Sequence, residues 1–185
     1  KMLRTAKALK NQTDAIIKTT FLALHAVPQA YTLNADAYVD LMINEVLPQV
    51  AEEGLADYVD AFCEEGYFSV AQTERLLMAA AKYGLKPKVH VNQFNAIGGI
   101  AACVKHKAIS VDHLEVMAAE DFNSLANSAT IATLLPICSL FIKIPYAPAR
   151  TLLQHDAKIA LATDFNPGSS PSGNMQLVQS LACTQ

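Results

Sequence analysis

Residues 58–92, YVDAFCEEGYFSVAQTERLLMAAAKYGLKPKVHVN, contain a strand, a helix and a second strand in succession. Tyr58–Cys63 and Lys88–Asn92 are short apolar runs, which predict buried strands. The helix between them is expected to begin at Ser69, because Gln72 stands three residues further on and completes a capping box. A strand, a crossover helix and another strand predict two neighbouring parallel strands.

The same alternation continues in both directions along the chain. Further strands are expected at 17–24, 108–113, 130–135 and 158–163. Further helices are expected at 35–50, 119–127, 146–155 and 174–183, with one more beginning at Gly98 and Gly99. Strands that are apolar on both faces are typical of parallel sheets covered by helices. Six β/α repeats fit a doubly wound sheet, and they also fit a (β/α)₈ barrel from which two units are missing.

Composition indicates one globular α/β domain over residues 1–185. The chain is 52% hydrophobic and 17% charged, with a formal net charge of −3. No basic block is present, so neither nucleic acid nor an anionic membrane is favoured as a partner. No apolar run is long enough for a membrane-spanning helix. Both ends of the sequence lie within helical patterns, and we therefore expect the chain to be part of a longer protein.

The four cysteines indicate a reducing compartment. Each stands alone in an apolar stretch and none forms a CxxC pair: Cys63, Cys103, Cys138 and Cys183. Isolated cysteines of this kind are expected to be buried, reduced thiols. The expected location is therefore the cytoplasm.

Polar residues gather where the predicted strands end. The residues at these ends are His25, Glu64, His90, Asp112, His113, Glu115 and Asp164. In barrel enzymes the loops that follow the strands converge, and the active site lies among them. A single histidine at a strand end is more often structural, but several such ends in one chain favour a site.

Three of these residues suit metal-assisted hydrolysis. His90 offers a neutral imidazole and Asp164 a carboxylate, both of which are ligands for a divalent ion. His113 is either a further ligand or a general base. Catalytic zinc normally takes three protein ligands, so His90 and Asp164 alone leave such a site incomplete.

The segment that follows Asp164 is rich in glycine, serine and proline and leads into the last predicted helix. Backbone N–H groups in such a loop, beside a helix N-terminus, favour an anion such as a substrate carboxylate. An ordinary surface loop is the alternative interpretation.

Five stretches together resemble the imidazolonepropionase family of the amidohydrolase superfamily. They are KTTFLALHAVP at 18–28, EEGLADYVDAFCEEGYFS at 52–69, KVHVNQF at 88–94, SVDHLE at 110–115 and ALATDFNPGSSPSGNMQLVQSLAC at 160–183. The resemblance spans essentially the whole chain. It implies a partial (β/α)₈ barrel of the metal-dependent hydrolase type, from about the third strand to the eighth. It also implies hydrolytic opening of 4-imidazolone-5-propanoate to N-formimidoyl-L-glutamate, a step of histidine degradation.

The resemblance also implies roles for individual residues. His90 and Asp164 would bind one zinc or iron ion, and His113 and Asp164 would carry the catalytic proton transfers. The substrate would be contacted by His25, Gln93, Asn166, Gly168 and Ser169.

The sequence departs from the family pattern at two points. The family's other two metal ligands form an HxH pair on the first barrel strand, and all five histidines here are isolated. The first barrel strands and a small β domain are also missing from this sequence. Many members carry Glu where Gln93 stands; Gln can donate and accept hydrogen bonds but cannot act as an ionised base.

Two other functions remain open at this point. Another amidohydrolase, such as a deaminase or a different cyclic amidase, would share the fold and ligands, although the DFNPGS segment argues against it. A non-catalytic folded module is the other alternative, because an incomplete barrel has two open sheet edges that seek partners, including a second copy of the chain.

Overall fold

The computed structural model describes residues 1–185, which form a single six-stranded parallel sheet. The strands are β1 (Thr20–Leu24), β2 (Tyr58–Cys63), β3 (Lys86–Val91), β4 (Ser110–His113), β5 (Ile131–Leu134) and β6 (Ile159–Leu161). They lie in the sheet in the order in which they occur in the chain. This topology confirms the predicted run of six β/α units.

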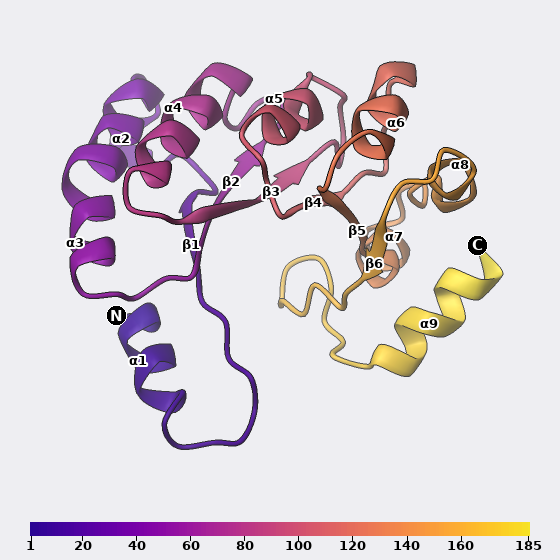
Figure 1. Ribbon diagram of the computed structural model, residues 1–185, viewed down its shortest axis with the longest axis horizontal. Helices are drawn as coiled ribbons and strands as arrows, with labels where there is room; N and C mark the ends of the chain where they lie inside the picture. Colours follow the sequence, from indigo (N-terminus) through magenta and orange to yellow (C-terminus); the bar gives the residue numbers. More distant parts are fainter.

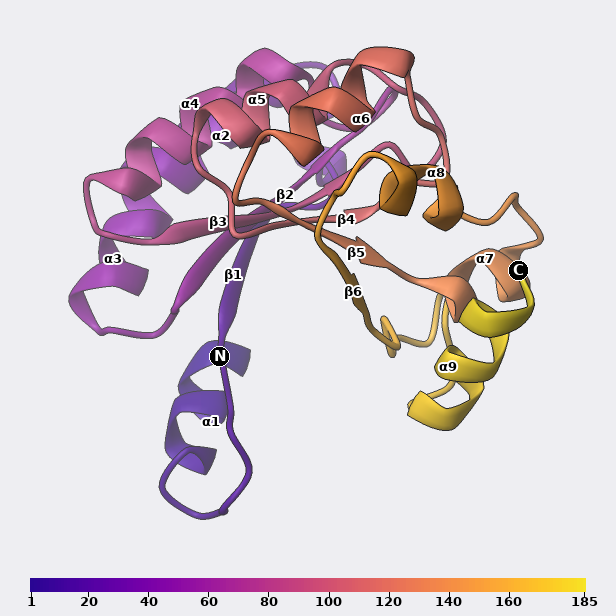
Figure 2. The ribbon, with the colours of Figure 1, turned by 45° about the vertical axis from the view of Figure 1, so that its right-hand side comes forward.

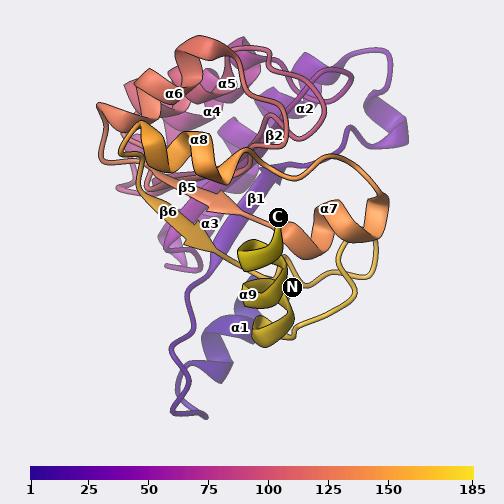
Figure 3. The same ribbon diagram turned by 90° about the vertical axis from the view of Figure 1, so that its right-hand side faces the viewer.

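Helices alternate with these strands. They are α1 (Met2–Leu9), α2 (Ala35–Leu41), α3 (Leu47–Glu52), α4 (Val70–Ala81), α5 (Gly99–Lys105), α6 (Ala119–Ala126), α7 (Pro136–Ile142), α8 (Ala149–Gln154) and α9 (Met175–Thr184). Helices α2, α4, α5, α6 and α8 lie on one side of the sheet (Figures 1 and 2). Helix α1 projects away from this layer, and α9 packs against α7 beside the last strands (Figure 3).

The core lies between the sheet and its helical layer. Residues 59–63 of β2 are all buried, as expected of a strand in the middle of a covered sheet. Gly99, in the first turn of α5, allows this helix to approach closely. A Cβ placed there would lie 3.0 Å from Cys63 Sγ and 3.1 Å from Val91 Cγ1.

The strand register sets polar side chains beside one another across the sheet. Phe62 pairs with His90, and His90 pairs in turn with Asp112. Val91 pairs with His113. Because the carboxyl ends of parallel strands all lie on the same side of the sheet, this register brings the ends of β2, β3 and β4 together.

Helix boundaries follow the local signals that the sequence contains. Ser69 accepts a hydrogen bond from Gln72 N at 3.2 Å, and Gln72 Oε1 accepts from Ser69 N at 3.0 Å, which confirms the capping box. Gly98 precedes α5 with a φ of +91°, a left-handed conformation that glycine adopts without strain. Asn174 caps α9 by accepting from Leu177 N at 3.1 Å.

Three expectations from the sequence are corrected. Helix α7 was not predicted, because Pro136 was interpreted only as the end of a strand, whereas it occupies the first turn of a helix. The helix expected over 146–155 is confined to Ala149–Gln154. Cys183 is exposed on α9, whereas Cys63, Cys103 and Cys138 are buried as expected; all four are free thiols.

The sheet does not close on itself. Strands β1 and β6 are at opposite edges and are not paired with each other. An open sheet of six in-order units distinguishes this chain from a doubly wound sheet, in which the strand order reverses. No helix of the structure has both the length and the apolar character needed to cross a membrane.

Candidate active site

A cavity of about 510 Å³ opens at the carboxyl ends of the strands. Its lining residues are Leu22, His25, Phe62, His90, Gln93, His113, Asp164, Asn166, Pro167, Gly168 and Ser169. Every residue assigned a catalytic, substrate-binding or metal-binding role from the sequence is in this set. The structure therefore brings together side chains that are up to 144 residues apart in the chain, from His25 to Ser169.

Three other strand-end residues do not line the cavity: Glu64, Asp112 and Glu115. Glu64 is 1% exposed, and its carboxylate accepts hydrogen bonds from the backbone of Glu65, Phe94 and Asn95. It holds the loop after β3 in place. Asp112 accepts from Ser110 Oγ at 2.9 Å within its own strand.

His90 is held by a buried carboxylate. Asp60 on β2 is 5% exposed, and its Oδ2 lies 2.9 Å from His90 Nδ1. A histidine that donates its Nδ1–H to a carboxylate presents Nε2 as a free acceptor, which is the arrangement found around metal-bound histidines. Sequence reasoning did not single out Asp60, because it stands in the middle of an apolar strand.

The contact between His90 and Asp60 shifts the pKa of both side chains. Burial by itself lowers the pKa of His90, but the charge and hydrogen bond of Asp60 outweigh it and raise that pKa to about 9. Burial raises the pKa of Asp60, opposed by His90. The charges of Asp112 and Asp164 also raise the pKa of His90.

His113 reaches the cavity from an irregular strand end. Its φ is +89° and that of Leu114 is +70°, both unusual for residues other than glycine. Its ring centroid lies 5.4 Å from that of His90, and the side chain is 3% exposed. Strained backbone of this kind is often found at functional sites.

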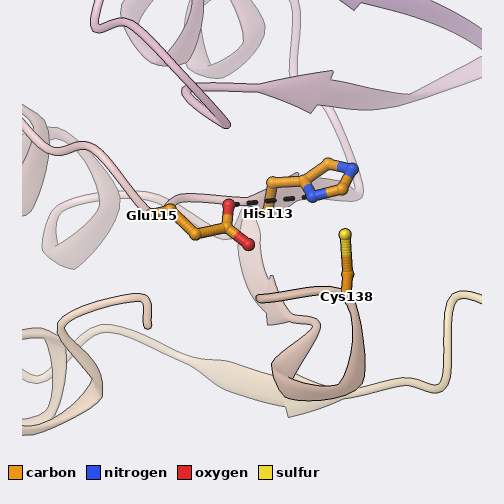
Figure 4. Close-up of side chains that lie close together, drawn as sticks. All are labelled: His113, Glu115 and Cys138. Carbon is orange, nitrogen blue, oxygen red and sulfur yellow. Dashed lines mark ion pairs between the residues drawn. The ribbon is translucent and has the colours of Figure 1, made fainter. Parts of the chain in front are cut away.

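A second cluster of potential metal ligands adjoins the cavity. Ligand atoms of His113, Glu115 and Cys138 lie within 4.8 Å of one another, and all three residues are buried (Figure 4). His113 Nδ1 and Glu115 Oε2 lack hydrogen-bond partners. The sequence placed Glu115 at a strand end and Cys138 in an apolar run, but gave no signal that they meet.

Cys138 also contacts Gln93, whose Nε2 donates to Cys138 Sγ at 3.5 Å. Burial raises the pKa of the Cys138 thiol to about 12, with additional effects from Asp164 and Glu115 that act in the same direction. The sulfur is therefore a protonated thiol at neutral pH. It is a weak ligand in this state, because metals bind the thiolate.

The loop after Asp164 is fixed by its own asparagine. Asn166 Oδ1 accepts from Gly168 N at 2.9 Å and from Ser169 N at 2.8 Å, and Asn166 Nδ2 donates to the Asp164 carbonyl at 2.7 Å. The amides expected to bind an anion are therefore already occupied. The side chains of Asn166 and Ser169 are also hydrogen-bonded to each other, through Asn166 Nδ2 and Ser169 Oγ at 3.0 Å.

The donor set fits a metal ion at one side of the cavity. His90 has its Nδ1 committed to Asp60 and Nε2 uncommitted, and Asp164 lines the same cavity. Imidazole nitrogen and carboxylate oxygen are ligands of catalytic zinc, and both also bind iron. Two ligands from this chain leave room for others.

Comparison with solved structures identifies the fold. A zinc-bound adenosine deaminase from Xanthomonas campestris superposes with a TM-score of 0.66 at 15% identity, covering 97% of this chain and 43% of that protein. A guanine deaminase from C. acetobutylicum with bound guanine gives a TM-score of 0.72 at 12% identity, covering 98% and 48%. The chain has the fold of six consecutive units of the (β/α)₈ barrel that these two enzymes share.

Sequence comparison is more specific. The chain is 60% identical over 183 residues to an imidazolonepropionase of Christiangramia forsetii and 54% identical over 183 residues to that of Flavobacterium psychrophilum. An imidazolonepropionase of Cupriavidus pinatubonensis is 44% identical over 185 residues. No family model matches the chain. The resemblance to imidazolonepropionase is confirmed along the whole chain, which spans 44% of the length of these relatives.

Proposed function

We propose that this chain forms part of the active site of a metal-dependent hydrolase. The reaction is the opening of the ring of 4-imidazolone-5-propanoate to N-formimidoyl-L-glutamate, in histidine degradation. The observation that carries this proposal is the cavity that joins His90, His113 and Asp164 with the loop from Asn166. The identity to imidazolonepropionases supports the choice of substrate over that of a deaminase or another cyclic amidase.

One zinc or iron ion is assigned to His90 and Asp164. Asp60 holds His90 Nδ1, so Nε2 is the atom that faces the ion. The chain supplies no HxH pair. The remaining ligands are therefore assigned to the part of the relatives that lies outside the matched region. When bound, such an ion supplies Lewis acidity, which polarises a carbonyl and lowers the pKa of water.

His113 and Asp164 are assigned the proton transfers. His113 Nε2 accepts a proton from the attacking water, and this proton then passes by way of the Asp164 carboxylate to the ring nitrogen that leaves. Both residues line the cavity. A buried base next to a polarised carbonyl contributes a rate factor of about 10²–10⁴.

The substrate contacts are assigned to the rest of the lining. His25 stands at the end of β1, with its ring centroid 6.3 Å from that of His90. Gln93 offers an amide to the imidazolone ring but no acid–base function. Asn166, Gly168 and Ser169 are assigned to the propanoate tail, whose carboxylate would replace Asn166 Oδ1 as the acceptor for Gly168 N, Ser169 N and Ser169 Oγ.

The chain alone is proposed to be one partial barrel domain over 1–185 that binds ligand without completing turnover. Its small-molecule substrate is the main partner, and the open edges at β1 and β6 favour a homodimer or association through an edge strand. The proposed location is the cytoplasm, where the buried free thiols Cys63, Cys103 and Cys138 stay reduced.

Metal binding tests the ligand assignment. The purified chain is titrated with zinc or iron(II) in competition with a chromophoric chelator, and bound metal is measured by mass spectrometry after dialysis. His90→Ala is expected to weaken binding at least tenfold. His155→Ala is the matched control, because His155 lies outside the cavity and its Nδ1 is 2.8 Å from the Thr151 carbonyl. Equal affinities of the two variants would remove His90 from the site.

Ligand binding tests the substrate assignment. N-formimidoyl-L-glutamate, the stable product, is added to the metal-loaded chain, and backbone amide shifts are followed by NMR. Shifts are expected at Gln93 and in the loop from Asn166 to Ser169. Amide shifts on addition of guanine or a triazine, and none on addition of N-formimidoyl-L-glutamate, would favour a different amidohydrolase.

A further inference from the structure

Two buried polar atoms face each other behind the cavity. His113 Nδ1 and Glu115 Oε2 lie 3.7 Å apart, with side chains 3% and 1% exposed. Neither atom has a hydrogen-bond partner. A buried polar atom without a hydrogen-bond partner destabilises the folded state. Two such atoms that lie side by side can pair with each other when one of them carries a proton.

The Glu115 carboxylate is already oriented by a third residue. Ser139 Oγ, in α7, donates to Glu115 Oε1 at 2.9 Å. This bond commits one carboxylate oxygen and leaves Oε2 directed at the imidazole. A carboxylate accepts hydrogen bonds and cannot donate them, so His113 must bring the proton to this contact.

The two nitrogens of His113 occupy different surroundings. Nδ1 is enclosed on the side of Glu115, while the ring lines the cavity. In Figure 4 one ring nitrogen faces Glu115 and the other points away from it. A proton fixed on Nδ1 leaves the lone pair of neutral imidazole on Nε2, on the cavity side.

We propose that Glu115 is a positioning residue that holds His113 in the tautomer protonated on Nδ1, with Ser139 orienting the carboxylate. The inference rests on the proposed function, in which His113 Nε2 accepts a proton from water. The observed separation exceeds that of a direct hydrogen bond, about 2.7–3.2 Å. Contacts in ligand-free sites are often long and shorten when the site is filled.

The tautomer can be read directly from the ring nitrogens. The chain is labelled with ¹⁵N-histidine, long-range ¹H–¹⁵N spectra are recorded above pH 8, and His113→Asn assigns the His113 signals among those of five histidines. The wild-type chain is expected to show a protonated Nδ1 and an unprotonated Nε2. Glu115→Met, which retains most of the side-chain volume, is expected to shift the tautomer ratio at least tenfold toward protonated Nε2.

Two further variants separate positioning from general disturbance. Glu115→Gln keeps an acceptor oxygen and is expected to restore most of the Nδ1–H form. Cys138→Ala removes the third member of the cluster but neither partner of the contact, so the wild-type ratio is expected. Amide spectra of each variant show whether the fold is retained.

The outcomes decide the inference independently of hydrolysis. Protonated Nε2 in the wild-type chain, or an unchanged ratio in folded Glu115→Met, overturns it. Zinc binding gives a third outcome. If the wild-type chain and His90→Ala bind zinc but Glu115→Met and Cys138→Ala both lose it, the inference is overturned and the cluster is a metal site. No metal or product binding combined with the expected tautomer would refute the proposed function and leave the positioning role intact.

Discussion

Asp60 and His90 stand on adjacent strands with Asp60 Oδ2 2.9 Å from His90 Nδ1, so the carboxylate faces the buried side of the imidazole. This contact fixes the ring orientation before any ligand arrives. A carboxylate behind a metal-binding histidine also increases the basicity of the ring.

Asp60→Asn is therefore expected to weaken zinc binding by about 10–100-fold, the usual effect of removing a carboxylate that orients a ligand histidine. Competition titration measures the change. Asp156→Asn is the control, because Asp156 is exposed in the turn after α8. An unchanged affinity in Asp60→Asn would show that His90 does not bind the ion through the orientation set by Asp60.

Asp57 anchors the start of the sheet and is expected to make stability dependent on pH. Its carboxylate accepts from Thr19 N at 2.8 Å and from Lys10 Nζ at 2.9 Å. The Thr19 backbone hydrogen bond, followed by Lys10, lowers the pKa of Asp57. Asp57→Asn is expected to reduce the free energy of unfolding at pH 7 by about 2 kcal/mol, as for hydrogen bonds to a charged group.

The sign of the pH effect follows from the lowered pKa. The folded chain prefers the ionised carboxylate, so the stabilisation is complete above the unfolded pKa of about 3.9 and is lost as pH falls below it. Urea unfolding at pH 7 and near pH 3 should show the difference between wild type and Asp57→Asn shrinking at the lower pH. Asp36→Asn, at an exposed pair with Arg75, should have little effect at either pH.

Gly99→Ala tests the packing of α5 on the sheet. The added Cβ would lie 3.0 Å from Cys63 Sγ and 3.1 Å from Val91 Cγ1, closer than ordinary contact. Overpacking of this kind costs about 1–3 kcal/mol, measured as a lower urea midpoint. Gly173→Ala is the matched control, because its Cβ would be 3.9 Å from Phe165 Cγ and is expected to be tolerated.

Ser69→Ala tests the capping box of α4. Removal of the hydroxyl that accepts from Gln72 N is expected to cost about 1 kcal/mol of stability. Thermal unfolding followed by circular dichroism measures it. Ser180→Ala in α9 removes an exposed hydroxyl that only donates to the Gln176 carbonyl, and a loss as large as that of Ser69→Ala would contradict the capping argument.

Association through the open sheet edges is expected to depend on concentration. Strands β1 and β6 each have one side without a neighbouring strand. Gel filtration with light scattering over a hundredfold range of concentration should show a growing fraction of dimers or larger species. A monomer at every concentration would contradict the edge argument.

Local patterns were sufficient to predict most of the fold. Apolar runs located all six strands, and Tyr58–Cys63 was predicted with its exact bounds. Ser69 and Gln72 identified the start of α4 because a capping box depends only on residues three apart. Helix α7 was missed because Pro136 both ends a strand and begins a helix, and a short apolar run does not distinguish the two.

The candidate site was predictable only in part, since a strand-end position is visible in the sequence and a contact between distant residues is not. The cavity gathers His25, His90, His113 and Asp164 as expected from their positions. Asp60 lies inside an apolar strand, and its contact with His90 depends on the register of β2 and β3. The meeting of Glu115 with Ser139 depends on the unpredicted α7.

The in-order arrangement of the strands has a consequence for dynamics. Each β/α unit is held mainly by its immediate neighbours, so the molecule resembles a short linear array whose ends can fray without the middle unfolding. His25 follows the first strand and Asp164 the last, so opposite walls of the cavity belong to the two units most exposed to fraying. Amide hydrogen exchange should be fastest in β1 and β6, and the lifetime of the assembled cavity should equal that of its less stable end.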